Sequence, residues 1–323
     1  MLQWVRPRHR NSMALYPLPP TAKRTAFFLN FFILSPVLVW PARRSSCRKY
    51  LKACGSLGYD GNRKSVPNRR SFMSTVLYTF SATGNSLTTA CKLAELLPDC
   101  TVKSVTTYGH RHSVTEEADA VGFVFPVYYG DMPWPVRNLI HKMVFAENAY
   151  LFAVPTYRGG WGDVNKRLNQ LLNTRGQKLS LSCGVPMPGN SFINEPQVDQ
   201  GYLDAQNENV EKAAERIRNR EVEDYRTDEI LPLRPVDHPN NFRGITAEES
   251  CVGCGVCVSV CPMGNIRLQD GKAVIGDNCA TCLACFHWCP AEAIWMSKQE
   301  NIARRSKYHH PDVVLGEIIA LKG

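Results

Sequence analysis

The sequence predicts an α/β unit with a five-stranded parallel sheet, followed by a small α+β module built around cysteines. Two observations support this organisation. Strand-like and helix-like segments alternate between residues 76 and 217, the pattern typical of a parallel sheet covered by helices. A cysteine phrase then occurs twice between Cys251 and Pro290, and each member of the first copy recurs 28 positions later. We therefore expect two folded parts of different class.

Five apolar runs predict the strands of the α/β unit, and the segments between them predict its helices. The candidate strands are 76–80, 101–105, 120–125, 150–154 and 179–185, and the candidate helices are 87–97, 136–144, 164–172 and 210–217. This succession fits a doubly wound sheet with strand order 2-1-3-4-5. Ligands of such sheets bind beyond the carboxyl ends of the strands, so the loops there are the first places to look for a site.

The loop after the first strand predicts an anion site. It reads Thr79-Phe80-Ser81-Ala82-Thr83-Gly84-Asn85-Ser86 and leads into a helix, where backbone N–H groups and the helix dipole favour a negative charge. Hydroxyl groups add donors, and Gly84 permits a close approach. A triphosphate-binding loop requires a lysine, and this loop has none. A dinucleotide-binding fingerprint requires three glycines, and this loop has one. It therefore predicts neutral donors for a phosphate, and a plain helix cap is the alternative.

Two further loops at the same edge of the sheet are rich in aromatic residues and glycine. Residues 126–130 contain Tyr128 and Tyr129, and residues 155–162 contain Tyr157, Gly159, Gly160 and Trp161. Aromatic rings stack on a flat ring system such as isoalloxazine, and glycine N–H groups can reach its polar edge. Together with the phosphate loop, these residues predict a flavin site. The alternative is that the rings simply pack beneath their loops.

Both copies of the cysteine phrase have the pattern C-x₂-C-x₂-C-x₃-C-P, and eight thiolates suffice for two 4Fe-4S clusters. The fourth cysteine of each run is expected to ligate the other cluster. One cluster would then be held by Cys251, Cys254, Cys257 and Cys289, and the second by Cys279, Cys282, Cys285 and Cys261. Zinc fits this spacing less well, and a disulfide framework suits a small secreted domain better than the end of a long chain with no credible secretory signal. Clusters with a structural or sensory role are a further alternative.

Residues 73–297 resemble the flavodoxin–ferredoxin fusion proteins of anaerobic bacteria and archaea. The resemblance rests on the loops already described, on Met187-Pro188-Gly189-Asn190, and on the doubled cysteine run. It implies an α/β flavodoxin-like fold followed by a small α+β two-cluster ferredoxin domain, with FMN and two 4Fe-4S clusters acting as an electron conduit. It also implies which residues hold FMN: Ser81, Thr83, Gly84, Asn85 and Ser86 at the phosphate, with Tyr128, Tyr129, Tyr157, Gly159, Gly160 and Trp161 around the ring.

The predicted domains are a basic leader at 1–72, an FMN domain at 73–200, a helical and proline-rich linker at 201–243, a ferredoxin domain at 244–297 and a tail at 298–323. The leader carries 14 basic side chains against Asp60, a net charge of +13, and the remaining 251 residues carry −4. The basic character therefore predicts no nucleic-acid binding by the folded domains.

The leader contains an apolar stretch at 26–40, which falls short of the ~20 residues that span a bilayer. We therefore expect no stable membrane anchor, with export or anchoring as alternatives. Met73 stands immediately before the first predicted strand. We expect the native chain to begin there, and the leader to be disordered or absent from it.

The combined motifs predict an electron carrier that exchanges electrons with redox partner proteins, an unidentified donor and an unidentified acceptor. A reducing compartment is needed for cluster assembly, so we expect a cytoplasmic protein. Asp131, Arg158 and Asp163 lie near the flavin loops, but such polar loop residues are mostly solvated, and no catalytic residue is predicted. The alternatives are an FMN-dependent reductase of a small molecule, fed by the clusters, and a cluster-bearing sensor or interaction protein.

Overall fold

The computed structural model describes residues 74–190, 195–232, 244–296 and 306–322, so the expected leader at 1–72 lies outside the described residues. The α/β domain is built on an all-parallel sheet in the order β2-β1-β4-β6-β7, with β8 also paired to β6. Its strands are β1 (Thr75–Thr79), β2 (Cys100–Ser104), β4 (Ala120–Pro126), β6 (Tyr150–Tyr157), β7 (Leu181–Ser182) and β8 (Val185–Pro186). The predicted order 2-1-3-4-5 is confirmed.

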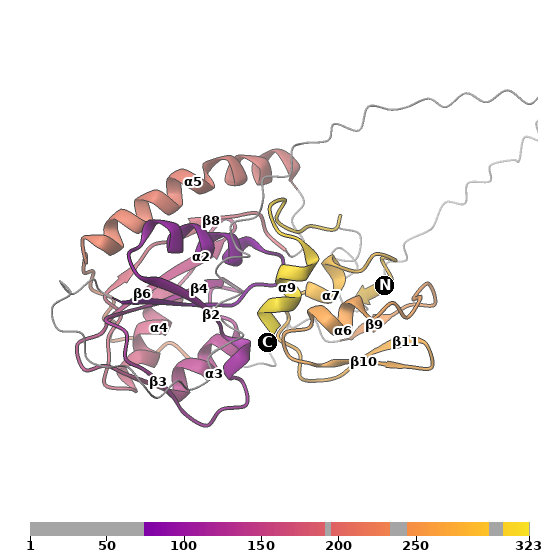
Figure 1. The fold of residues 1–323 in the computed structure, drawn as a ribbon, viewed down its shortest axis with the longest axis horizontal. Coiled ribbons are helices and arrows are strands. Elements are labelled where there is room, and N and C mark those ends of the chain that lie inside the picture. The colour runs from indigo at the N-terminus through magenta and orange to yellow at the C-terminus, as the bar shows by residue number, and fades with distance from the viewer. Residues whose placement is uncertain (1–73, 191–194, 233–243, 297–305, 323) are drawn as a thin grey trace, which may run out of the picture. The chain divides into compact units, whose positions relative to one another are not determined.

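Helices cover both faces of this sheet (Figure 1), with α2 (Asn85–Leu96) and α5 (Pro196–Arg218) on one side and α3 (Trp134–Lys142) and α4 (Val164–Asn173) on the other. Alternate residues of each strand enter the two cores. In β4, Val121 and Phe123 pack with α3 and α4, whereas Val124 packs with α2 and α5. Burial on both faces explains why the strands read as nearly continuous apolar runs.

Three local features depart from the predicted elements. The fifth strand is not continuous: it divides into β7 and β8 around Gly184, whose Cα lies so close to Trp161 that an added Cβ would stand 2.4 Å from the indole. The second predicted helix, α3, ends at Lys142, and β5 (Met143–Phe145) follows, paired with β3 (Val114–Glu116). A 3₁₀ helix at Thr106–Tyr108 follows β2. None of these short pieces has a periodicity that the sequence could reveal.

Helix α5 corrects the predicted linker at 201–243. The helix begins at Pro196 and runs to Arg218, and its Val210, Ala213, Ala214 and Ile217 are buried against the sheet. Those four positions have the i, i+3, i+4, i+7 spacing of one helix face. Residues 201–218 therefore belong to the α/β domain, because they cover one of its sheet faces, and the remaining part of the linker stays a prediction.

The cysteine module repeats its structure as well as its sequence. It contains β9 (Ile245–Ala247), α6 (Val256–Val260), β10 (Ile266–Gln269), β11 (Lys272–Ile275), α7 (Ala284–His287) and β12 (Ile294–Met296). Each half is a strand, a cysteine run with a short helix, and a second strand. The halves exchange partners, since β9 pairs with β12 and β10 with β11. This pairing relates the two halves by a pseudo-twofold axis, as their repeated sequence does.

Left-handed backbone positions follow the same repeat. In the first half they are Gly253, Gly255 and Gly264, with φ of 65°, 76° and 59°. Their counterparts 28 positions later are Thr281, Leu283 and Glu292, with φ of 54°, 60° and 50°. Non-glycine residues in this region cost about 1–2 kcal/mol each. The cysteine loops therefore require this geometry in both halves, even where no glycine is present.

The tail, for which the sequence carried no structural prediction, returns to the α/β domain. Val313, together with Ile318 and Leu321 of α9 (Leu315–Lys322), is buried in the core that contains α3 and α4. The backbone carbonyl of Leu321 accepts a hydrogen bond from Thr106 Oγ1 at 2.7 Å. Residues 306–322 are thus an integral part of the fold. Among the described residues, no helix combines the length and the apolar character needed to cross a membrane.

Candidate flavin and iron-sulfur site

The phosphate loop connects β1 to α2 at the carboxyl edge of the sheet. Gly84 has φ of 100° and immediately precedes the first residue of α2, Asn85. Its N–H donates to Ser81 Oγ at 3.2 Å, and Ser86 Oγ lies 2.8 Å from Thr156 Oγ1 at the end of β6. The first turn of α2 carries no acidic residue, so the positive end of the helix dipole is left for an anion.

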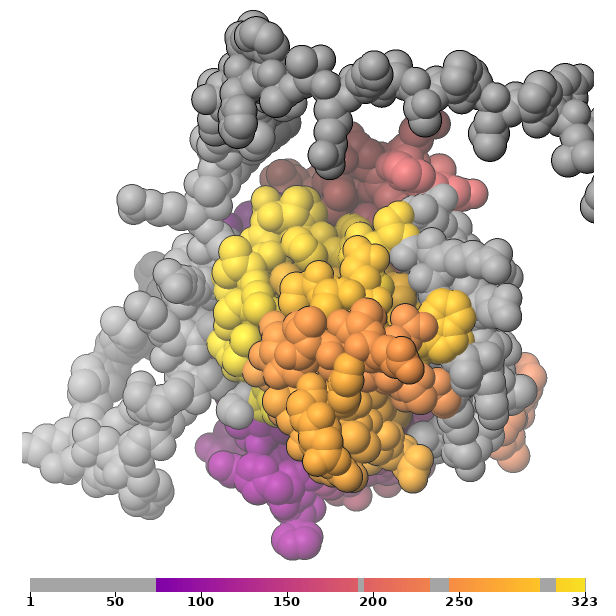
Figure 2. All heavy atoms as spheres, turned by 90° about the vertical axis from the view of Figure 1, so that its right-hand side faces the viewer, coloured from indigo at the N-terminus to yellow at the C-terminus, as the bar shows by residue number. Residues whose placement is uncertain are grey.

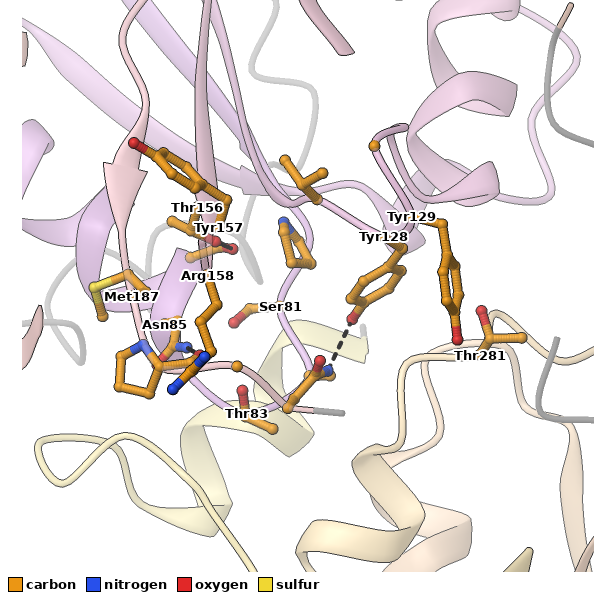
Figure 3. Close-up of a pocket in the computed structure, with 18 of the residues that line it drawn as sticks. Ser81, Thr83, Asn85, Tyr128, Tyr129, Thr156, Tyr157, Arg158, Met187 and Thr281 are labelled. Atoms are coloured by element: carbon orange, nitrogen blue, oxygen red, sulfur yellow. Dashed lines mark hydrogen bonds between the residues drawn. The ribbon is translucent and has the colours of Figure 1, made fainter. Parts of the chain in front are cut away.

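A cavity of about 250 Å³ opens beside this loop (Figure 3). Tyr128, Tyr129 and Thr281 stand at one side of it, and Tyr157, Arg158 and Met187 at the other. The full lining comprises Ser81, Ala82, Thr83, Asn85, Ser86, Pro126, Val127, Tyr128, Tyr129, Gly130, Thr156, Tyr157, Arg158, Gly160, Met187, Pro188, Gly189, Asn190 and Thr281. Polar loop donors, aromatic rings and apolar side chains thus surround one space, the composition that a phosphorylated flat ring requires.

Eight of the eleven residues predicted to bind FMN line this cavity, and three do not. Gly84 faces the tail instead, since a Cβ added there would lie 2.8 Å from Val313 Cγ2. Trp161 stacks on Tyr157, with ring centroids 5.4 Å apart, and also packs on Gly184. Gly159 is the third. Trp161 therefore packs against Tyr157, which lines the cavity, but does not line the cavity itself. The role of each residue toward FMN remains a prediction.

The tyrosine side of the cavity is half-buried and hydrogen-bonded. Asn190 Nδ2 lies 3.4 Å from Tyr128 Oη and donates to the carbonyl of Cys282 at 3.0 Å. Burial raises the pKa of Tyr128 well above its ordinary value, and neighbouring Cys282 adds to the effect, so the phenol stays protonated. Burial also raises the pKa of Tyr129 to about 12. Both rings can therefore donate hydrogen bonds at neutral pH.

Sequence reasoning did not assign Thr156, Arg158, Asn190 or Thr281 to the site. Asn190 belongs to a segment that the resemblance singled out, but the others carry no spacing signal. Arg158 Nη2 contacts Glu195 at 2.5 Å and its Nε contacts Asp199 at 3.0 Å. Burial is the largest single contribution and lowers the pKa of the Arg158 guanidinium, but the two carboxylates together outweigh it and raise this pKa. The guanidinium is thus held in place rather than solvated.

Asp131 and Asp163 differ in their surroundings. Asp131 is 2% exposed, accepts the N–H of Met132 at 2.7 Å, and lies 3.6 Å from Arg137. Asp163 is half exposed and 3.7 Å from Lys166. The expectation of a solvated side chain is therefore wrong for Asp131, because the loop that carries Tyr128 and Tyr129 turns this carboxylate inward. Neither carboxylate lines the cavity.

The eight cysteines of the doubled run fall into two groups of four. One cavity is lined by Cys251, Cys254, Cys257 and Cys289, and another by Cys261, Cys279, Cys282 and Cys285. These are the two predicted sets, with the fourth cysteine exchanged between runs. The grouping follows from the intertwined strand pairing, which places the end of each run beside the start of the other.

The cysteine surroundings fit an iron-sulfur cluster. Backbone N–H groups of Asn265, Thr281 and Ala293 each lie 3.3 Å from a cysteine Sγ, at Cys261, Cys279 and Cys289 respectively. Such bonds stabilise the negative charge of ligating sulfur. Burial raises the pKa of the Cys279, Cys282 and Cys285 thiols, so their thiolates need a bound cation. Iron held by these cysteines would supply that charge.

The second cysteine run forms part of the wall of the flavin cavity. Thr281 lines the cavity, while its N–H donates to Cys279 Sγ at 3.3 Å. Trp134 Nε1 donates to the carbonyl of Cys279 at 3.2 Å, and His287 Nε2 lies 2.7 Å from the carbonyl of Asn190. The group of cysteines around Cys282 is therefore the one that lies next to this cavity, with Thr281 between them.

Known proteins resemble mainly the cysteine module. The 4Fe-4S dicluster domain family matches residues 250–293. Pyruvate synthase subunit PorD of Methanocaldococcus jannaschii is 39% identical over 62 residues, which are 19% of this chain and 72% of that protein. An uncharacterized ferredoxin of the same organism is 32% identical over 65 residues, and the chain spans only 39% of that ferredoxin.

In the α/β part, a flavodoxin of Streptococcus pneumonia TIGR4 aligns at a TM-score of 0.30 and 14% identity, over 45% of this chain and 97% of that one. That likeness is too low to add weight, and the flavodoxin-like assignment rests on the parallel sheet and its strand order. A 4Fe-4S dicluster domain is an electron-transfer unit. The chain belongs to the 4Fe-4S dicluster ferredoxin family, and its preceding flavodoxin-like domain makes it a flavodoxin–ferredoxin fusion protein.

Proposed function

We propose that the protein carries electrons between FMN in the cavity and two 4Fe-4S clusters held by the eight cysteines. The observation that carries this proposal is the position of Thr281, which lines the cavity and donates its N–H to Cys279 Sγ. A single residue thus separates the space for the flavin from a sulfur of the second cysteine group. When bound, FMN exchanges one or two electrons and each cluster exchanges one.

The residues of the chain position the cofactors and exclude water. The N–H groups at the start of α2 and the hydroxyls of Ser81, Thr83 and Ser86 would hold the phosphate. Tyr128 and Tyr129, both protonated at neutral pH, would flank the ring and keep water from the side that faces the cysteines. This arrangement favours electron transfer through the module over chemistry on a dissolved substrate.

The other cysteine group gives the proposed carrier an external terminal. Cys254 is exposed, and beside it Val252 and Leu268 are 71% and 45% exposed. An apolar patch next to a cluster ligand is where a redox partner protein would approach. The donor and the acceptor are defined here only as proteins that exchange single electrons, and the proposed location is the cytoplasm.

Cofactor analysis of the full chain, purified without oxygen, tests the proposal. We expect one FMN, eight iron and eight sulfide per chain, and dithionite reduction should produce the EPR signals of two interacting clusters. Stopped-flow mixing should then show that the clusters and the flavin exchange electrons within the protein. Two clusters without flavin, or a flavin that the reduced clusters do not reduce, would refute the carrier.

A further inference from the structure

The tail contacts the phosphate loop through Tyr308, His310 and Val313. Tyr308 Oη donates to Asn85 Oδ1 at 2.6 Å, and the N–H of His310 donates to the carbonyl of Thr83 at 2.7 Å. Val313 packs on Gly84, where no space for a Cβ remains. Three successive residues of the loop are therefore contacted by a segment more than 220 positions away in the sequence.

The ferredoxin module contacts the same loop through Trp288. Its indole N–H donates to the carbonyl of Ala82 at 2.9 Å, and its ring stacks on His309, with centroids 4.3 Å apart and planes inclined by 12°. The N–H of Tyr308 donates to His287 Nδ1 at 3.0 Å. In Figure 2 the yellow tail lies against the orange module, in keeping with the bond from Lys322 Nζ to the carbonyl of Val258. Tail and module thus act on the loop as one unit.

These contacts determine the direction of the loop's N–H groups. In a trans peptide the C=O and the following N–H point in opposite directions. Because Trp288 binds the carbonyl of Ala82 from outside, the N–H of Thr83 is directed away from Trp288. In the same way, the bond from His310 orients the N–H of Gly84, which donates to Ser81 Oγ inside the loop. A loop whose donors are fixed in advance binds an anion with less loss of entropy.

We propose that Trp288 and Tyr308 are positioning residues for the phosphate loop, so that recognition of the flavin phosphate depends on the ferredoxin module and the tail. This inference rests on the proposed binding of FMN. Trp288 immediately precedes Cys289 and lies three residues after Cys285. These two cysteines belong to different cysteine groups. The α/β domain alone therefore lacks the contacts that complete its phosphate site.

The test compares FMN with riboflavin, which lacks the phosphate. Flavin is removed from the full-length, cluster-loaded protein, and the dissociation constants of both ligands are measured by fluorescence titration without oxygen. Trp288→Phe and Tyr308→Phe should each weaken FMN binding about fivefold, as the loss of one hydrogen bond predicts. Riboflavin affinity and iron content should not change.

Trp134→Phe provides the matched control. It also removes an indole N–H that donates to a backbone carbonyl between the same two domains, but that carbonyl is in Cys279 and not in the phosphate loop. The control should keep the wild-type preference for FMN. Unchanged preference in both Trp288→Phe and Tyr308→Phe, or an equal loss for FMN and riboflavin, would overturn the inference. A wild-type protein that binds neither flavin would overturn the proposed function itself.

Discussion

His310 gives the tail a pH-dependent attachment to the α/β domain. The residue is 1% exposed, its Nε2 lies 3.0 Å from Gln206 Oε1, and its Nδ1 accepts the N–H of Asp312 at 3.1 Å. The neutral ring satisfies both partners, whereas a proton on Nδ1 would face another N–H. Burial is the main cause that lowers the pKa of His310 to about 4, with repulsion from Lys92 and His309 and an opposing attraction from Asp312.

The lowered pKa means that the docked tail binds fewer protons than the released tail. Acid therefore favours release, while docking is at full strength above pH 6.5, the ordinary pKa of the side chain. Each pH unit between 6.5 and about 4 costs the docked state about 1.4 kcal/mol. Lowering the pH from 7.5 to 5.5 should weaken docking by about 1.3 kcal/mol, close to tenfold.

Hydrogen exchange measures this effect on peptides that cover residues 306–322, after correction for the intrinsic pH dependence of exchange. Wild-type protein should lose protection about tenfold between pH 7.5 and 5.5. His310→Asn is the control, because its Oδ1 can still accept the N–H two residues on but does not titrate. Equal wild-type protection at both pH values, or the same tenfold loss in His310→Asn, would refute the reasoning.

Three other changes test separate parts of the molecule. Cys261→Ser should abolish rapid electron exchange with the flavin in stopped-flow mixing, because Cys261 belongs to the cysteine group beside the cavity. Cys289→Ser should retain this exchange, because Cys289 belongs to the other group. The reverse result would contradict crossed ligation. Ser86→Ala removes the hydroxyl that lies 2.8 Å from the buried hydroxyl of Thr156. It should weaken FMN binding about fivefold in a fluorescence titration. An unchanged affinity would argue against this loop as the phosphate site. Val210→Ala should lower the free energy of unfolding in urea by about 2 kcal/mol, and a change below about 0.5 kcal/mol would mean that α5 is a solvated linker after all.

The fold could be predicted wherever the sequence pattern is local. The buried strands appear as apolar runs because both faces of a parallel sheet are covered, and the repeated cysteine phrase specifies both halves of its module. Helix α5 was recognised only at 210–217, because its preceding turns carry mostly exposed polar residues and lack an apolar stripe. The tail received no structural prediction: Ile318 and Leu321 have the i, i+3 spacing of one helix face, but a stretch this short gives too weak a periodicity to indicate a helix.

The site shows the same limit. The phosphate loop and the cysteine groups could be predicted because the chemistry expected of them depends on residue types at fixed spacing. Thr281 and Asn190 were not assigned, because their positions depend on how the module packs on the α/β domain. Trp161 was predicted to flank the flavin ring because of its residue type, but it packs on Gly184 and stacks on Tyr157 instead. Residue type alone does not tell a ring that lines a cavity from one that supports it.

The two halves of the cysteine module differ at equivalent positions in a way that bears on the proposed electron carrier. Gly253 and Thr281 occupy equivalent left-handed positions, but a Cβ on Gly253 would lie 2.4 Å from the carbonyl of Gly271. Only the second half has room for a side chain at this position. Its residue, Thr281, is β-branched and lines the cavity, although the left-handed backbone conformation is unfavourable for such a residue. The first half instead leaves Cys254 exposed beside Val252. If the protein is the proposed carrier, this asymmetry assigns the second cysteine group to exchange with the flavin and the first group to exchange with the partner.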